Sequence, residues 1–323
     1  MRSTGSSAAS AKPASSSSVP LSLTADEALA ITVEDPAAPY AARWLPQGLS
    51  ELSGHARATI AVKTGAAAEA PSTMPTLTVG PVRGWMSDRY LILRGTAAGG
   101  DVDLAGCRAV LRVDPSSGNT GEAAMYGMLT IAAGVLLAGL GRALIHGAAV
   151  VPPSDGAWVL VGDSGSGKST TCATLARAGW SYLSDDQVIL SGAERGLTVE
   201  GWVRPFHLDA GWDRGKRSGD REAHNAGTLF PGLRRTTAPL AGLLLPKVAS
   251  KQSTATSPAD PAEALAELIR QSPWVLLDRG AAPVVLDLLA AAASRCRPPR
   301  RLTLGADSYG SPERMSSVLA AIL

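Results

Sequence analysis

The stretch from Gly162 to Thr170, GDSGSGKST, limits the folds open to this chain more than any other feature. It matches the pattern GxxxxGK[ST] in full, after the apolar run AWVLVG and before residues typical of a helix. Between a strand and a helix, such a loop binds phosphate, because its glycines let backbone N–H groups turn inward and the helix N-terminus favours an anion. The motif predicts a nucleotide-binding α/β domain.

The whole loop is expected to contact the nucleotide, and two of its side chains have particular roles. Lys168 should reach the β- and γ-phosphates, and Ser169 should ligate Mg²⁺. ATP and Mg²⁺ are therefore the expected ligands, although the motif alone is shared by GTPases, ATPases and kinases of several kinds. The predicted nucleotide-binding residues are Gly162, Asp163, Ser164, Gly165, Ser166, Gly167, Lys168, Ser169 and Thr170.

Two adjacent carboxylates, Asp185 and Asp186, follow the loop after room for one helix, a turn at Gly179 and one short strand. This spacing predicts that the pair ends the strand next to the strand of the loop. Carboxylates in that position can hold Mg²⁺ or accept a proton from an attacking hydroxyl, so we expect the two to divide these tasks. The alternative is an ordinary turn after a strand.

His146 lies in ALIHGAAVV, the predicted strand before AWVLVG. A histidine in an apolar run is often only a core residue, but a strand beside the site would let its imidazole contact an aspartate or a phosphate. Arg204, in WVRPFHLD, and Lys247, in LLLPKV, are weaker candidates for phosphate or substrate contacts. Arg204 could instead form a surface ion pair, and Lys247 could instead reach solvent.

The segments HGA, GDSGSGKST and LSDD, at these intervals, resemble the catalytic domain of the HPr kinase/phosphorylase family, whose nucleotide core is related to that of phosphoenolpyruvate carboxykinase. The resemblance covers residues 146 to about 190. The order of elements is also similar to that of the HPr-kinase-like proteins of lasso-peptide biosynthesis. The resemblance implies an ATP-dependent kinase that phosphorylates a serine of a peptide or small protein, with Asp185 as general base. The other implied site residues are Asp186, Lys168, Ser169 and His146, with Ser169 and Asp186 at the metal.

The chain departs from that family in its C-terminal part. It has no convincing copy of the segment with which HPr kinase/phosphorylases bind their protein substrate, so HPr itself is not the expected acceptor. Two other functions stay open: a nucleotide-binding switch or assembly protein without kinase activity, and a small-molecule or carboxykinase-like enzyme. Because the relatives are hexameric, homo-oligomerisation is a hypothesis to test.

Three regions are predicted along the 323 residues. Residues 1–24 are a Ser/Ala-rich tail expected to be disordered, because such a composition buries too little apolar surface. Residues 25–121 form a small β-rich region with strand-like runs such as ARATIAVKTG and DRYLILRG. Residues 122–323 form the α/β catalytic domain, whose later part predicts helices in PAEALAELIRQ, APVVLDLLAAAASR and SPERMSSVLAAIL and a strand in RRLTLGAD.

Composition excludes several partners. A net charge of +2 gives no electrostatic case for nucleic acid or for an anionic membrane. The apolar segment Ala123 to Leu144 is long enough to span a bilayer, but its small residues and the site-like segment after it predict a helix buried in the protein. Three scattered cysteines indicate neither disulfides nor a zinc site, so a reducing cytoplasm is the expected compartment.

Overall fold

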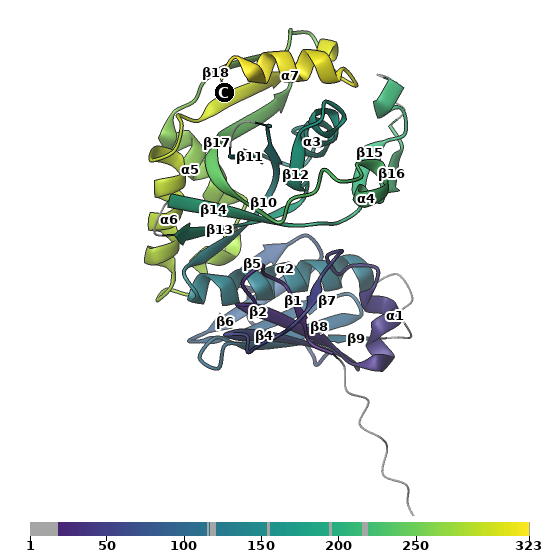
Figure 1. The fold of residues 1–323 in the computed structure, drawn as a ribbon. Coiled ribbons are helices and arrows are strands. Elements are labelled where there is room, and N and C mark those ends of the chain that lie inside the picture. Colours follow the sequence, from purple (N-terminus) through teal and green to yellow (C-terminus); the bar gives the residue numbers. More distant parts are fainter. Residues whose placement is uncertain are drawn as a thin grey trace, which may run out of the picture.

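The computed structural model describes residues 19–114, 116, 121–153, 156–193, 196–214 and 219–322, and Figure 1 shows them folded into two layered parts. The mixed α/β class predicted from the sequence is confirmed. Most of the predicted tail, residues 1–18, lies outside the described residues. Its last residues belong to the fold, because Leu21–Ser22 forms strand β1 and the carbonyl of Leu23 accepts a hydrogen bond from Trp202 Nε1 at 2.8 Å.

The N-terminal part is one nine-stranded sheet in the order β3-β1-β2-β4-β9-β8-β7-β6-β5. Strands β2, β4 and β9 are parallel, and the other pairs are antiparallel. Side chains alternate between buried and exposed along β4 and β9, which is typical of a sheet covered on one face. The bounds are β1 Leu21–Ser22, β2 Leu29–Val33, β3 Ser50–Glu51, β4 Ala58–Thr64, β5 Leu77–Val79, β6 Val82–Ser87, β7 Tyr90–Gly95, β8 Ala98–Asp103 and β9 Arg108–Val113, with the short helix α1 at Ala38–Ala41.

Helix α2, Glu122–Gly139, lies between the two parts (Figure 1). It packs against β8 and β9 of the N-terminal sheet on one side and against β10 on the other. Its 18-residue window has a mean hydropathy of 1.5 and is 72% buried, so among the described residues the one helix apolar enough for a membrane lies inside the protein. It ends before the predicted Leu144, because Gly141 turns the chain with a φ of +73° and strand β10 begins at Arg142.

The C-terminal part contains an eight-stranded sheet in the order β11-β10-β13-β14-β17-β19-β18, in which β11 also pairs with β17 and β12 pairs with β10. Two long strands, β10 and β17, change partners along their length. The first half of β10 pairs with β13, and its second half pairs with β11 and β12. The bounds are β10 Arg142–Val151, β11 Ala157–Val161, β12 Ser181–Ser184, β13 Gln187–Ala193, β14 Gly196–Trp202, β17 Thr237–Val248, β18 Ala255–Pro258 and β19 Arg300–Leu304.

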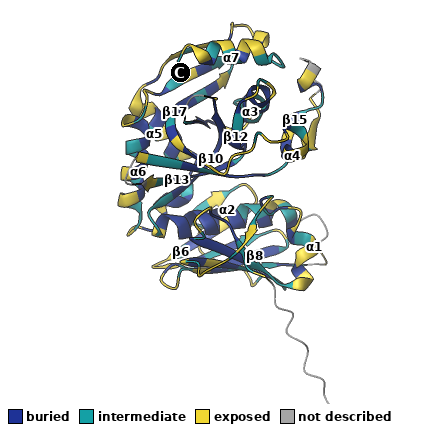
Figure 2. Cartoon of the chain, viewed as in Figure 1, coloured by how far each residue is buried: buried dark blue, intermediate teal, exposed yellow. Residues whose placement is uncertain are grey.

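The helices of the C-terminal part cover this sheet on two sides. Helices α3 and α7 pack together, and α5 packs on α6, which contacts β10 and β17. A small hairpin of β15 and β16 with the short helix α4 lies near α3 (Figure 1). The buried residues in Figure 2 run through the strands and along α2, so the core continues from one part into the other. The bounds are α3 Lys168–Arg177, β15 Phe206–Asp209, β16 Arg221–His224, α4 Ala226–Leu229, α5 Pro261–Arg270, α6 Ala282–Ser294 and α7 Pro312–Ala320.

Gly134 marks the tightest contact of α2 with the C-terminal part. A Cβ atom there would lie 2.2 Å from Cδ1 of Trp274, whose indole Nε1 donates to the carbonyl of Leu144 at 2.8 Å. We predict that Gly134→Ala lowers the free energy of unfolding by about 1–3 kcal/mol, because the buried indole must shift. Gly139→Ala is the control, since no atom lies within 4 Å of its Cβ position. Urea denaturation measures both, and equal stability of the two variants would contradict the packing argument.

Candidate active site

The glycine-rich loop lies between a fully buried strand and the start of a helix, as predicted. All five residues of β11 are buried, and α3 begins at Lys168. Gly165 and Gly167 have φ angles of +82° and +102°, which other residues rarely adopt. A Cβ at Gly167 would also lie 2.4 Å from Cδ1 of Leu304. The loop conformation therefore requires glycine at these positions.

The loop residues border several cavities, and two of them also contain predicted site residues from other elements. The first is lined from the loop by Ser164, Gly165, Gly167, Lys168, Ser169 and Thr170, and from elsewhere by His146, Asp185, Asp186, Arg204, Pro205, His207 and Arg221. The second, on the other side of the loop, is lined by β17, β19 and α5 and includes Lys247. The amides at the N-terminus of α3, the ammonium of Lys168 and the side chains of Arg204 and Arg221 suit an anion in the first cavity.

The hairpin on the far side of the first cavity contributes His207 and Arg221. It is anchored by aromatic packing, with the ring centroids of Phe206 and Tyr182 5.5 Å apart and those of Phe206 and Phe230 5.6 Å apart, all nearly perpendicular. The sequence did not indicate the part that this hairpin plays, because nothing in it fixes the direction of the His207 and Arg221 side chains.

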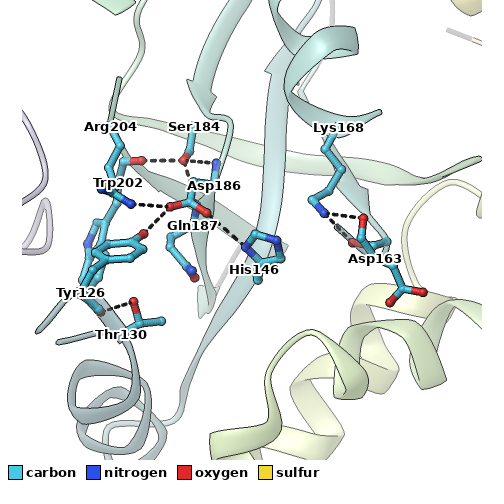
Figure 3. A network of polar contacts seen from close by, with 11 residues as sticks. Tyr126, Thr130, His146, Asp163, Lys168, Ser184, Asp186, Gln187, Trp202 and Arg204 are labelled. Atoms are coloured by element: carbon cyan, nitrogen blue, oxygen red, sulfur yellow. Dashed lines mark hydrogen bonds and ion pairs between the residues drawn. The ribbon is translucent and has the colours of Figure 1, made fainter. Parts of the chain in front are cut away.

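Lys168 is buried, and its amino group lies against its own loop (Figure 3). The Nζ atom donates to the carbonyl of Gly162 and, at 3.1 Å, to that of Asp163. Burial lowers the pKa of Lys168, although the charges of the nearby aspartates oppose that effect. The Asp163 side chain points elsewhere and accepts from Arg270 at 3.1 Å and from Gln271 at 3.2 Å.

The two aspartates occupy a break between β12 and β13. Both strands pair with β10, with Ser184 opposite Ala149 and Gln187 opposite His146. The prediction that the pair ends the strand next to the loop's own strand was wrong. Strand β10 lies between β11 and β12, because its second half pairs with one of them on each side.

The hydroxyl of Ser184 stabilises this break. Its Oγ accepts from the backbone N–H groups of Asp186 and Gln187, both at 3.1 Å, and donates to the carbonyl of Trp202 at 2.5 Å (Figure 3). The amide of Gly147 in turn donates to the carbonyl of Asp186 at 3.0 Å. The backbone of Asp186 is therefore fixed by hydrogen bonds at both its N–H and its carbonyl group.

Asp185 is the more buried aspartate, with 7% of its surface exposed. Burial raises the pKa of its carboxyl to about 8, and the charge of Asp186 adds to this effect, while a hydrogen bond with Ser169 opposes it. The contact places Asp185 beside the hydroxyl that the loop motif assigns to the metal. The sequence had instead grouped Ser169 with Asp186.

Asp186 is held by three side chains around the first cavity (Figure 3). Its Oδ1 lies 3.2 Å from Nδ1 of His146, and its Oδ2 accepts from the hydroxyl of Tyr126 and lies 3.5 Å from Nη1 of Arg204. Burial acts to raise the pKa of Asp186, but the hydrogen bonds from His146 and Tyr126 and the charges of His146 and Arg204 outweigh it and lower the pKa to about 2. Asp186 is therefore ionised at neutral pH.

The predicted site residues are brought together except for Lys247, which is exposed and borders the second cavity. Arg204 lies against Asp186, with its guanidinium 3.7 Å from the ring centroid of Tyr126. Sequence reasoning missed Tyr126, which stands 60 residues before Asp186 in an apolar helix. The only signal for it was a polar group among the apolar residues of AAMYGML.

In the part of the chain that the structure describes, no three His, Cys, Asp or Glu side chains converge on a metal position. This donor set still fits Mg²⁺ in a nucleotide complex, because Mg²⁺ commonly uses one or two protein oxygens together with phosphate oxygens and waters. The donors here would be the Ser169 hydroxyl and the Asp185 carboxylate.

Comparison with known proteins leaves the family open. No family model and no curated protein matches the chain. Among solved structures, the HPr(Ser) kinase/phosphatase from Coxiella burnetii is similar, with 15% identity over 37% of this chain and 71% of that chain, at a TM-score of 0.26. That similarity is distant, and it is too weak to establish either the core fold or the activity.

We predict that Asp185→Asn stabilises the metal-free protein at alkaline pH. A folded-state pKa raised to about 8 means that the protein loses stability as the pH rises from the unfolded value of 3.8 towards 8, because the charged form is unfavourable in the fold. Thermal melts in EDTA should show a gain in melting temperature of the variant over wild type that is smaller at pH 5 than at pH 8, where it should reach several degrees. An equal difference at both pH values would contradict this account.

Proposed function

We propose that this chain is an ATP- and Mg²⁺-dependent kinase that transfers the γ-phosphoryl group to a serine hydroxyl of a peptide or small protein. One observation carries the proposal. A glycine-rich loop at a helix N-terminus and two aspartates with opposite pKa shifts border the same cavity. Phosphoryl transfer needs these two elements together, a place for phosphate and a carboxylate for the attacking hydroxyl.

Asp185 and Ser169 form the metal side of the proposed site. They are hydrogen-bonded to each other, and the burial that raises the pKa of Asp185 would be offset by a divalent cation, which favours the charged carboxylate. This assignment exchanges the roles that the sequence suggested, in which Asp185 was the base and Asp186 the metal ligand. The reason is the hydrogen bond that Ser169 makes with Asp185 and, among the interactions of the described residues, not with Asp186.

Asp186 forms the acceptor side. Its carboxylate is ionised, lines the cavity and is 23% exposed, so it can accept a hydrogen bond from an entering hydroxyl. A loose transition state demands little basicity of this group, so its main task is to orient the hydroxyl. His146, 3.2 Å away, lets the pair hold the proton that the hydroxyl loses.

Lys168 and the amides of the glycine-rich loop supply the remaining charge stabilisation. Among the described residues, the ammonium group hydrogen-bonds to two backbone carbonyls of the loop and forms no ion pair, so it can swing towards a phosphate. A bound nucleotide with Mg²⁺ supplies the phosphoryl group and part of the neutralising charge. The choice of a peptide serine as acceptor rests on the sequence resemblance.

The two aspartates should respond differently to removal of their charge. Asp186→Asn is expected to lower kcat about 10²- to 10⁴-fold and to leave the Kd for Mg·ATP within about threefold of wild type. Asp185→Asn should instead raise the Mg²⁺ concentration needed for nucleotide binding. Titration calorimetry with Mg·ATP and a phosphate-transfer assay separate these effects. Asp287→Asn, an exposed carboxyl on α6, is the control.

The reverse pattern, in which Asp185→Asn binds Mg·ATP normally and transfers nothing, would restore the assignment made from the sequence. Normal transfer by both variants would exclude an aspartate at the acceptor side.

The acceptor can be sought by mass. Co-expression with the short open reading frames encoded beside the gene should yield a peptide heavier by one phosphate, and the Lys168→Ala protein should yield none, because the phosphate site has lost its charge. Nucleotide-dependent partner binding without any phosphorylated product would favour the nucleotide switch instead.

A further inference from the structure

Among the interactions of the described residues, Tyr126 is the one residue of helix α2 that hydrogen-bonds to either of the two aspartates. The proposed mechanism does not yet assign it a role. Its hydroxyl donates to Oδ2 of Asp186, on the side opposite His146 (Figure 3). Its ring supports the guanidinium of Arg204 at 3.7 Å, and that group lies 3.5 Å from the same oxygen.

We propose that Tyr126 is a positioning residue that fixes the orientation of the Asp186 carboxylate, so that helix α2 and the N-terminal sheet behind it form part of the catalytic unit. The expected effect of Tyr126 on catalysis rests on the proposed kinase function. The geometry itself stands independently of that function.

The hydrogen bonds to Asp186 restrict the rotation of its carboxylate. The terminal torsion of an aspartate has a broad minimum, so a carboxylate with one partner can turn about it. Asp186 has donors on both oxygens, with His146 Nδ1 on Oδ1 and the Tyr126 hydroxyl on Oδ2. Two donors on opposite sides restrict the rotation, and they leave the remaining lone pairs facing the cavity that Asp186 lines.

The Tyr126 donor is itself held in place by the fold. Tyr126 lies on a helix enclosed between β10 and the strands of the N-terminal sheet, and a precise site needs such a support. Burial and the charge of Asp186 raise the pKa of Tyr126 well above its usual value, so the phenol stays protonated and remains a donor.

The alternative is a purely structural role, because a buried phenol needs an acceptor wherever it lies. The two roles differ in what Tyr126→Phe should change. The phenyl ring keeps the packing and the support for Arg204, and only the hydrogen bond to Asp186 is lost. Thr130→Val is the matched control, because it removes another hydroxyl from the same helix, one turn further on, without touching Asp186.

We expect Tyr126→Phe to lower kcat roughly 10- to 100-fold, as for a reacting group that is misplaced, with KM for ATP within about twofold of wild type. The assay is transfer from Mg·ATP to the peptide found by co-expression. Thr130→Val should keep kcat, and thermal melts should show both variants folded. In the Asp186→Asn background, Tyr126→Phe should cause no further loss. Equal kcat for Tyr126→Phe and Thr130→Val would overturn the proposal.

A second measurement does not depend on turnover. In protein labelled with ¹⁵N-histidine, the His146 imidazole, assigned among the four histidines by His146→Gln, should shift in Tyr126→Phe and stay unchanged in Thr130→Val. If the wild type transfers no phosphate to any peptide, the proposed kinase function fails and this spectrum alone decides the role of Tyr126. An unchanged His146 signal in Tyr126→Phe would overturn the positioning role.

Discussion

The candidate site depends on a break in the hydrogen bonding beside strand β10. Strands β12 and β13 both pair with β10, Ser184 opposite Ala149 and Gln187 opposite His146, and the two residues between them depart from the regular strand. Those residues are Asp185 and Asp186. The Ser184 hydroxyl accepts hydrogen bonds from two backbone N–H groups at the break. These buried donors are therefore satisfied although no regular strand pairing is present. The same break places Asp186 next to His146 on β10.

The surroundings of the two carboxylates make them chemically different although they are neighbours in the chain. Adjacent like charges raise the cost of ionising both, and the protein resolves this by giving nearly all the donors to one of them. Asp186 has the imidazole, the phenol and the guanidinium, whereas Asp185 has the Ser169 hydroxyl and little solvent. Ionising Asp185 in the absence of a cation therefore lowers the stability of the folded protein. Functional sites often carry a loss of stability of this kind.

Local features could be predicted from the sequence, and features that depend on pairing between distant segments could not. The glycine-rich loop, the start of α3 at Lys168 and the C-terminal helices follow from residues within one or two turns of each other, and the structure confirms them. Strand β8 was missed because AGGDVD reads as a turn. Its glycines serve close packing instead, since Cβ atoms at Gly99 and Gly100 would lie 2.7 Å from Ala67 and 2.6 Å from Leu111.

The position of the Asp pair was predicted only in part for the same reason. Its distance from the loop along the chain was informative, but the sequence does not say which strand β12 pairs with. Tyr126 shows the limit more clearly. A tyrosine in an apolar helix is usually a packing residue, and only the fold, which packs α2 against β10, reveals that its hydroxyl meets Asp186.

The composition of α2 has a physical cause that also bears on the predicted boundary at residue 121. A helix covered by sheets on both sides must be apolar around its whole circumference, which is why its hydropathy is close to that of a membrane span. The N-terminal sheet is further joined to the C-terminal part by the bond from Trp202 Nε1 to the Leu23 carbonyl. A chain cut at residue 121 would expose one face of α2 to water and free the helix that carries Tyr126. The two parts are therefore distinct in topology, but they share one core.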